Sequence, residues 1–226
     1  HTEKTKLVIE RCTLGFIEGM PRASVAVDLA SQVVLNFIEK SDEVTTKEVT
    51  KAVFEFVTSQ GFLPICSAFP GTFKTWAAII NWVGTHSYPE KHLLLSHVLN
   101  KFQSGFLSST SQVKHDFAMS ILMSAFIVYS GSENDYKESI VAIEEMLSKA
   151  LKKAELVEVC LLLVRVLVLR FDQVLFKRIW VRSWPDLNLI TQQALLFNED
   201  PKSTLAVLKF LDQFVAMGQQ DIHEVL

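Results

Sequence analysis

Apolar residues recur at helical spacing along the whole of this 226-residue chain, and this periodicity limits the possible folds more than any other feature. Within residues 23–39, for example, Val27, Ala30 and Val34 fall on one helical face. Glycine (8 residues) and proline (6 residues) are scarce, and no pair of segments has the pattern of two strands. The sequence therefore predicts an all-α protein of roughly ten helices with short connections.

The helix ends are expected at glycine, proline and capping residues. Ser130-Gly131 is interpreted as a helix stop in which glycine adopts left-handed backbone angles. Trp184-Pro185 is expected to begin a new helix, and Asp200-Pro201 forms an N-cap and first-position pair. The helices are expected over residues 7–19, 23–39, 45–59 (with a Thr45/Glu48 capping box), 76–84, 89–106, 117–129, 135–153, 156–171, 174–181, from 185 onward and 201–217, with a short helix or turn in FLPICSAF.

Two helices with their links occupy about 40 residues, which is the period of HEAT and armadillo repeats. We therefore expect a HEAT/armadillo-like α-solenoid, and a globular multi-helix bundle is the alternative. Residues 1–226 are expected to form a single all-helical domain. The chain lacks an initiator methionine and its helical pattern continues to the last residue, so we expect a fragment of a longer protein.

The most apolar segment is LVEVCLLLVRVLVLRF, residues 156–171. It contains Glu158, Arg165 and Arg170, whereas a membrane-spanning helix needs about 20 residues with few or no charges. It is predicted instead to be the central buried helix, with Leu161, Leu162, Val166 and Leu169 inaccessible to solvent. The two arginines then need carboxylate or carbonyl partners, and Asp212 is one candidate.

The net charge of −3 and the pI near 6.1 argue against a nucleic-acid-binding protein. No signal peptide is visible in residues 1–20. The sequence contains no GxSxG, Walker, GxGxxG or kinase signature, so we expect neither an enzyme nor a cofactor. Glu144 and Glu145, like Glu133 and Asp135, are interpreted as acids on a solvated helix face.

No metal site is expected. Three cysteines lie far apart in apolar segments and are interpreted as small buried residues of a reducing compartment: Cys12, Cys66 and Cys160. Three histidines lie close in sequence without the spacing of a two-histidine metal motif, and are interpreted as exposed or capping: His86, His92 and His97.

Two basic groups are candidate sites for an anionic lipid headgroup, because cations beside aromatic residues suit a membrane interface. The first lies beside Trp180 and Trp184 and consists of Lys177, Arg178 and Arg182. The second ends a predicted helix and consists of Lys149, Lys152 and Lys153. A solvated helix face is the alternative interpretation of both groups. The four tryptophans are expected in the core, or lining a groove for a partner: Trp76, Trp82, Trp180 and Trp184.

An ordered set of segments in residues 73–217 resembles the C-terminal region of the Dopey family. The set comprises AFIVYSG, an acidic link with Asp135-Tyr136, IEEMLSKAL, VRVLVLRF, Trp184-Pro185 and LKFLDQFVA. Residues 1–72 share only the helical character of that family.

This resemblance implies a non-enzymatic scaffold of membrane traffic on the cytosolic face of Golgi and endosome membranes. It implies partnership with a large Golgi protein related to Arf exchange factors, and linkage to an aminophospholipid flippase. It also implies binding of phosphatidylinositol 4-phosphate and self-association as a homodimer. The alternative function is a helical-repeat adaptor in an unrelated nuclear or cytoskeletal complex.

Overall fold

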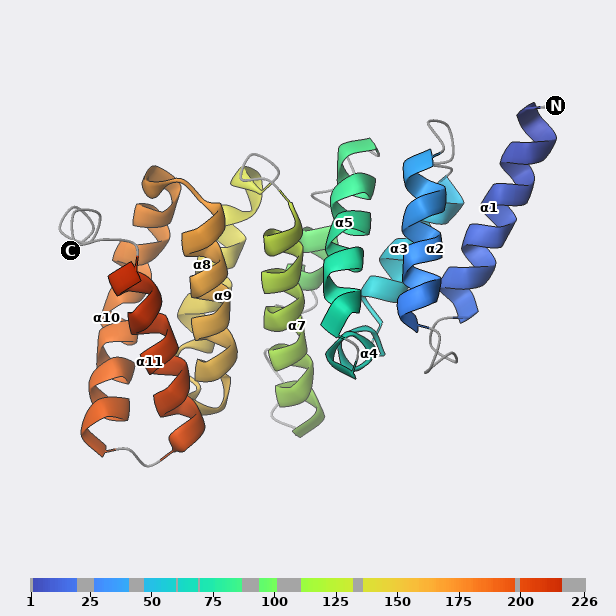
Figure 1. Cartoon of the computed structure of the whole chain (residues 1–226). Coiled ribbons are helices and arrows are strands. Elements are labelled where there is room, and N and C mark those ends of the chain that lie inside the picture. Colours follow the sequence, from blue (N-terminus) through green and yellow to red (C-terminus); the bar gives the residue numbers. More distant parts are fainter. Residues whose placement is uncertain are drawn as a thin grey trace. The chain divides into compact units, whose positions relative to one another are not determined.

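In the computed structural model of the chain, every regular element is a helix (Figure 1). Helices make up 93% of the part of the chain that the structure describes, and that part contains no strand, which confirms the all-α prediction. The described residues are 2–19, 27–40, 47–59, 61–68, 70–86, 94–100, 111–131, 136–197 and 200–216. The Thr45 capping residue lies outside them.

The chain divides into two compact units, residues 1–94 and 95–226. The first unit contains α1 (Thr2–Gly19), α2 (Val27–Lys40), α3 (Lys47–Val57), α4 (Phe62–Ala68) and α5 (Pro70–His86). Helix α2 packs against α5, and α1 packs against α2 and α3. Helix α1 ends at Gly19 and FLPICSAF contains the short helix α4, as the sequence predicts.

The core of the first unit is built around Trp76, which is fully buried. The rings of Phe56 and Phe62 lie 4.9 and 5.6 Å from its ring centroid. Its indole N–H donates to the Ser31 hydroxyl at 2.9 Å, so the polar atom of a buried aromatic side chain has a partner. The core expectation for Trp76 is therefore confirmed.

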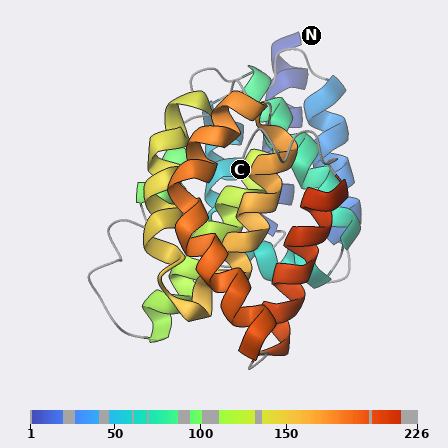
Figure 2. The same cartoon turned by 90° about the vertical axis from the view of Figure 1, so that its left-hand side faces the viewer.

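The second unit contains α7 (Ser111–Ser130), the 3₁₀ turn η3 (Lys137–Ser139), α8 (Ile140–Ala150), the 3₁₀ turn η4 (Ala154–Leu156), α9 (Val157–Arg170), α10 (Gln173–Phe197) and α11 (Pro201–Ala216). Helix α9 packs between α7 and α11, and these three lie side by side in Figure 1. Helix α10 packs against α8 and α11, as Figure 2 shows from the C-terminal side.

Helix α9 is central to this unit, but the prediction of its buried face is partly wrong. Leu161 is fully buried, as predicted. Leu162 and Leu169 are 39% and 62% exposed, and Val166 is half-buried. The exposed positions 158, 162 and 169, with the half-buried position 165, form one stripe along the helix, because residues separated by three or four positions share a face. The apolar residues that point inward instead include Val157, Cys160, Leu163, Val164, Leu167 and Val168.

Both arginines of α9 find partners, though neither partner is a carboxylate. The Arg165 Nε–H donates to the Gln213 side-chain oxygen at 2.9 Å, and the Gln213 amide donates to the Arg165 carbonyl at 2.9 Å. This reciprocal pair ties α9 to α11, so the suggestion of Asp212 was wrong by one residue. The Arg170 guanidinium lies 5.3 Å from the ring centroid of Tyr129 on α7, a cation–π contact.

Helix α10 continues through Pro185, so the predicted helix start at this residue is wrong. Trp180, Ser183 and Leu187 are buried at i, i+3 and i+7, and this inward face runs without a break past the proline. Pro185 cannot donate to the carbonyl of Val181, but both residues are on the exposed side of the helix, where water can satisfy that oxygen. Packing of the inward face thus overrides the local preference for a boundary.

The N-cap of α11 is confirmed. The Asp200 carboxylate accepts hydrogen bonds from the backbone N–H of Lys202 and of Ser203, both at 3.2 Å, and from the Ser203 hydroxyl at 2.5 Å. These bonds lower the pKa of Asp200, and the largest effect comes from the Ser203 hydroxyl. Pro201 occupies the first helical position, where the missing N–H costs nothing.

Ser130-Gly131 ends α7 as predicted, but the reason for glycine is a close approach and not a left-handed backbone. The Tyr136 hydroxyl reaches back to donate to the Ile127 carbonyl at 2.7 Å. Its phenol ring then lies where a Cβ of residue 131 would be. The buried Tyr136 therefore closes the end of α7 only because Gly131 has no side chain.

We expect Gly131→Ala to lower the free energy of unfolding by about 1–3 kcal/mol, the usual cost of overpacking. The measurement is urea unfolding followed by circular dichroism. Gly61→Ala is the matched control, since the nearest atoms to a Cβ there lie 3.9 Å away, an ordinary contact. Equal losses in the two variants would contradict the steric role of Tyr136.

Candidate functional site: the seam between α8 and α10

A buried carboxylate lies where α8 packs against α10. Glu144 is 3% exposed and forms ion pairs with two arginines of α10. The Arg178 Nε lies 2.7 Å from Glu144 Oε1, an ion pair without the alignment of a hydrogen bond. The Arg182 Nη1–H donates to Glu144 Oε2 at 3.4 Å. The expectation of a solvated Glu144 is therefore wrong, and we call these three residues the Glu144 cluster.

Helix geometry explains the cluster. Arg178 and Arg182 are one turn apart and share a face of α10, as their i, i+4 spacing predicts. On α8, Glu144 lies on the inward face beside Ile140, Ile143 and Leu147. The side chains of Arg178 and Arg182 remain 59% and 49% exposed. Each guanidinium therefore contacts the buried carboxylate with one edge and keeps other N–H groups available to solvent.

The remaining cations of the two predicted groups do not gather in one place. Lys177 is exposed on α10, next to the Glu144 cluster in sequence. Lys153 lies 4.7 Å from the ring centroid of Phe117 on α7, whereas Lys152 lines a pocket next to α10, and Lys149 is exposed. The structure thus joins Arg178 to Arg182 and separates Lys152 from Lys153.

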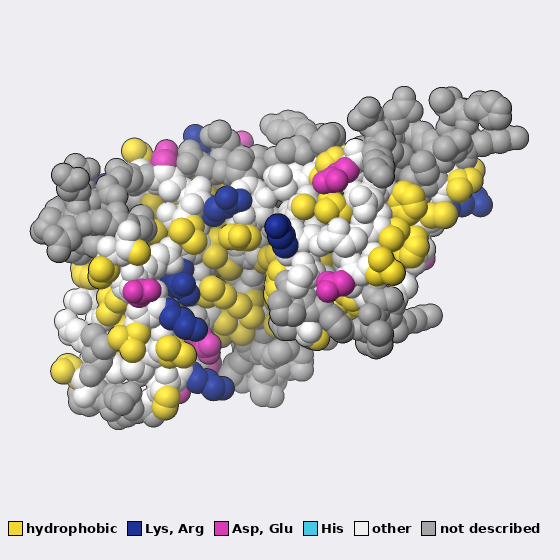
Figure 3. Space-filling model, in the orientation of Figure 1, with side chains coloured by type: hydrophobic (Ala, Val, Ile, Leu, Met, Phe, Trp, Pro, Cys, Tyr) yellow, Lys and Arg dark blue, Asp and Glu magenta, His cyan; other side chains and the backbone are white. Residues whose placement is uncertain are grey.

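Among the α10 side chains that the structure describes, four aliphatic ones project into solvent. Val174, Val181, Leu189 and Leu196 are 77%, 63%, 54% and 75% exposed. They are spaced by seven or eight residues, so they form one stripe along the helix, on the same side as Arg178. Basic side chains lie among apolar ones on the side of this unit seen in Figure 3.

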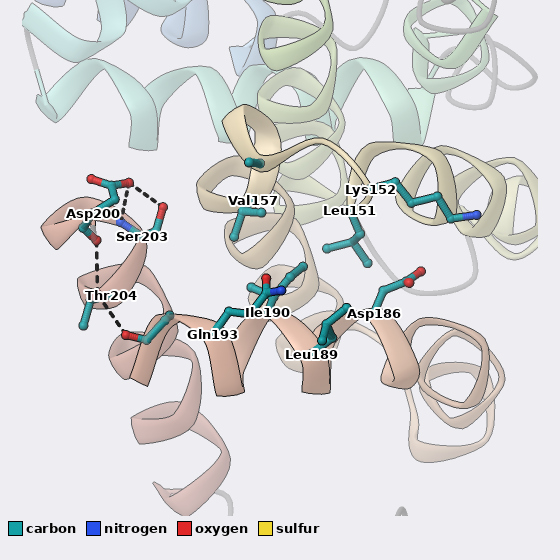
Figure 4. A pocket seen from close by; sticks show the side chains of 12 residues that line it. Leu151, Lys152, Val157, Asp186, Leu189, Ile190, Gln193, Asp200, Ser203 and Thr204 are labelled. Atoms are coloured by element: carbon teal, nitrogen blue, oxygen red, sulfur yellow. Dashed lines mark hydrogen bonds between the residues drawn. The ribbon is translucent and has the colours of Figure 1, made fainter. Parts of the chain in front are cut away.

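A pocket of about 740 Å³ lies one turn beyond Arg182 along α10. Leu151 from the turn after α8 and Val157 from the start of α9, with Leu189 and Ile190 of α10, form its apolar middle (Figure 4). Lys152 and Asp186 lie at one end of it, and Asp200, Ser203 and Thr204 lie at the other. Gln193, Ala154 and Ala194 complete the lining.

The other predicted candidates have the following places. Trp180 is buried and stacks on Phe210 with a centroid distance of 6.2 Å, whereas Trp82 and Trp184 are half-buried. His97 is exposed, and His92 lies outside the described residues. In the described ranges, no three residues among the histidines, cysteines and acids are placed to hold a metal ion.

The cysteines differ from one another. Cys66 and Cys160 are buried as predicted, but Cys12 is exposed on α1, so the prediction for it is wrong. Burial is the main cause that raises the pKa of Cys66 to about 12, with a smaller effect of the Asp28 charge. Burial also raises the pKa of Cys160.

Comparison with known proteins adds no assignment: no family model, curated protein or solved structure matches this chain. Among the helices described, none combines the length and the apolar character needed to span a bilayer.

Neither Glu144 nor Asp186 was identified from the sequence as a residue of the candidate site. Glu144 occurs at i+4 from Ile140 and i+1 from Ile143, so its place on the apolar face of α8 was a readable signal. Asp186 carries no such signal, because its pocket joins residues 151–157 to residues 186–204, which are distant from them in sequence.

Proposed function

We propose that this chain is a non-enzymatic scaffold of Golgi and endosome membrane traffic, and that α10 presents a surface for anionic membrane lipid. The observation that supports the lipid surface most is the outward side of α10. There Lys177, Arg178 and Arg182 lie beside the exposed aliphatic stripe of Val174 and Val181. A helix with cations and aliphatic side chains on its exposed surface has the composition of an interfacial helix.

The expected affinity is modest. A cation near an anionic membrane surface contributes about 1 kcal/mol, so three cations give weak, additive recruitment. Glu144 offsets part of this attraction, although it is buried behind the arginines. The exposed aliphatic residues add burial of apolar area in the interface.

A HEAT/armadillo-like solenoid is the architecture that we propose for the scaffold. Its support lies in each unit taken separately. In the second unit alternate helices pack together, α7 with α9 with α11 and α8 with α10, as in stacked helical repeats. The proposed partners, a large protein related to Arf exchange factors and an aminophospholipid flippase, follow from the Dopey resemblance, as does self-association.

Vesicle sedimentation tests the lipid surface. The variant Glu144→Gln/Lys177→Gln/Arg178→Gln/Arg182→Gln removes three cations and one anion, so that no buried charge remains without a partner. We expect it to bind vesicles containing phosphatidylinositol 4-phosphate several-fold more weakly than the unchanged chain. Binding of the unchanged chain should also fall with added salt, because salt screens exposed charges.

Lys202→Gln/Lys209→Gln is the matched control. Both lysines are exposed on α11, and their loss lowers the net charge by two, as the fourfold change does. This control should retain most of the binding. Equal weakening in the two variants would show that net charge alone governs binding, and would refute a surface on α10. Vesicles with phosphatidylserine at equal charge show whether the phosphoinositide headgroup is distinguished.

A further inference from the structure

The pocket beyond the Glu144 cluster has two charged side chains of opposite sign at one end. Lys152 comes from the turn after α8, and Asp186 comes from α10 (Figure 4). Within the described part of the chain, neither side chain has an ion-pair or hydrogen-bond partner. Both charged groups extend to the same side of the pocket, beside Leu151 and Leu189. This end therefore offers one free ammonium and one free carboxylate next to apolar surface.

The polar groups at the opposite end are already occupied. The Asp200 carboxylate caps α11 through Lys202 and Ser203. The Thr204 hydroxyl donates to the Asp200 carbonyl at 3.1 Å, and also lies 3.4 Å from the Ala194 carbonyl. Among the described residues that line the pocket, only Lys152 and Asp186 carry a charge without a protein partner.

We propose that this pocket binds a zwitterionic amphiphile, a molecule with an apolar body and with an ammonium and an anionic group together at one end. The anionic group pairs with Lys152, the ammonium pairs with Asp186, and the body lies along Leu151, Val157 and Ile190. A purely anionic head would place its charge beside Asp186, and a purely cationic head would place its charge beside Lys152. Like charges brought together in this way oppose binding, so the charge pattern selects a zwitterion.

The volume agrees with a ligand of this kind. Small-molecule pockets occupy about 300–1,000 Å³, mostly lined by apolar groups with a few polar groups that fix orientation. The same chemistry is found in a single-chain zwitterionic phospholipid and in a free apolar amino acid. The pocket volume of about 740 Å³ is larger than one amino acid side chain needs, which favours the phospholipid. Separate titrations with the two ligands distinguish these sources.

The test is calorimetric titration of the whole chain with lysophosphatidylethanolamine below its micelle concentration, and separately with leucine. Lysophosphatidic acid and dodecylamine serve as ligands with an anionic and a cationic head alone. We expect saturable binding of the zwitterionic lysolipid and clearly weaker binding of the other two amphiphiles. Saturable binding of leucine at similar affinity would assign the site to amino acids within the same proposal. No saturable binding of either zwitterion would overturn it.

Charge reversal gives the sharper result. Lys152→Glu and Asp186→Lys should each weaken zwitterion binding about tenfold or more, because each leaves two like charges at the pocket end. The double swap should restore most of the affinity, since the zwitterion then meets the same two charges in exchanged places. Lys209→Glu and Asp212→Lys, both exposed on α11 outside the pocket, are the matched controls and should leave binding unchanged. A double swap that binds no better than the single reversals would refute the pairing.

Discussion

Replacing Leu163 by alanine should lower the free energy of unfolding of the second unit by about 2–5 kcal/mol, the usual cost of emptying a core leucine site. Leu163 is fully buried in α9, the helix that packs against α7 and α11. Leu162, the preceding residue, is 39% exposed. Its change to alanine should cost less than about 1 kcal/mol, since truncation there leaves a site open to water.

The comparison is well controlled because both substitutions make the same chemical change at adjacent positions of one helix. Urea unfolding measures the free energy, and hydrogen exchange of the α9 amides assigns the loss to this unit. The exchange measurement is needed because two compact units need not unfold in a single transition. Similar losses at Leu162 and Leu163 would mean that α9 is rotated from the orientation described.

The second large effect is expected at the Glu144 cluster. Arg178→Ala/Arg182→Ala should destabilise the second unit by about 2–3 kcal/mol, because a buried carboxylate then loses both partners. This value is below the usual range for buried ion pairs because both arginines are half-exposed, and water screens such groups. Because of this expected loss of stability, alanine changes at these arginines are unsuitable for the lipid-binding test.

Removing the buried charge together with the arginines should reverse most of the loss. Glu144→Gln/Arg178→Gln/Arg182→Gln should unfold within about 1 kcal/mol of the unchanged chain, since no charge is left buried without a partner. Thermal and urea unfolding of the two variants are the measurements. A triple variant as unstable as the double alanine variant would show that packing of the arginine side chains, and not the stranded charge, sets the stability.

The elements could be predicted well wherever local signals agreed. Gly19, Ser130 and Asp200 mark helix ends in the structure as they do in the sequence. Pro185 was the misleading signal, because proline indicates a boundary locally while Trp180, Ser183 and Leu187 continue one buried face through it. The tertiary packing of that face determines that the helix continues through Pro185. This could be predicted only from the apolar pattern of the whole of α10 and not from the residues next to the proline.

The orientation of α9 could also be predicted from the sequence, but from the positions of its charged residues and not from its leucines. Glu158 and Arg165 are seven residues apart and mark the solvent stripe, on which Leu162 also lies. Because nearly every residue of α9 is apolar, a buried face chosen from its leucines alone, without Glu158 and Arg165, is the wrong one. The same reasoning applies to Glu144, whose position among isoleucines indicated burial, whereas its identity as an acid suggested exposure.

The candidate site was predictable only in part. The shared face of Arg178 and Arg182 follows from their spacing alone. Their common carboxylate lies 34 and 38 residues away in sequence, and the pocket joins the α8–α9 connection to parts of α10 and α11. Which distant segments meet depends on the packing of whole helices, and this chain has no repeat consensus that would fix it.

The cysteines allow each unit to report on its own opening. Cys66 lies in the first unit and Cys160 in the second, both buried and both with raised pKa values. A buried thiol that stays protonated reacts with an alkylating reagent only after its surroundings open. Once Cys12 is replaced by serine, the alkylation rate at each of the two remaining cysteines measures how often its own unit opens. Mass spectrometry of the digested chain gives both rates from one reaction.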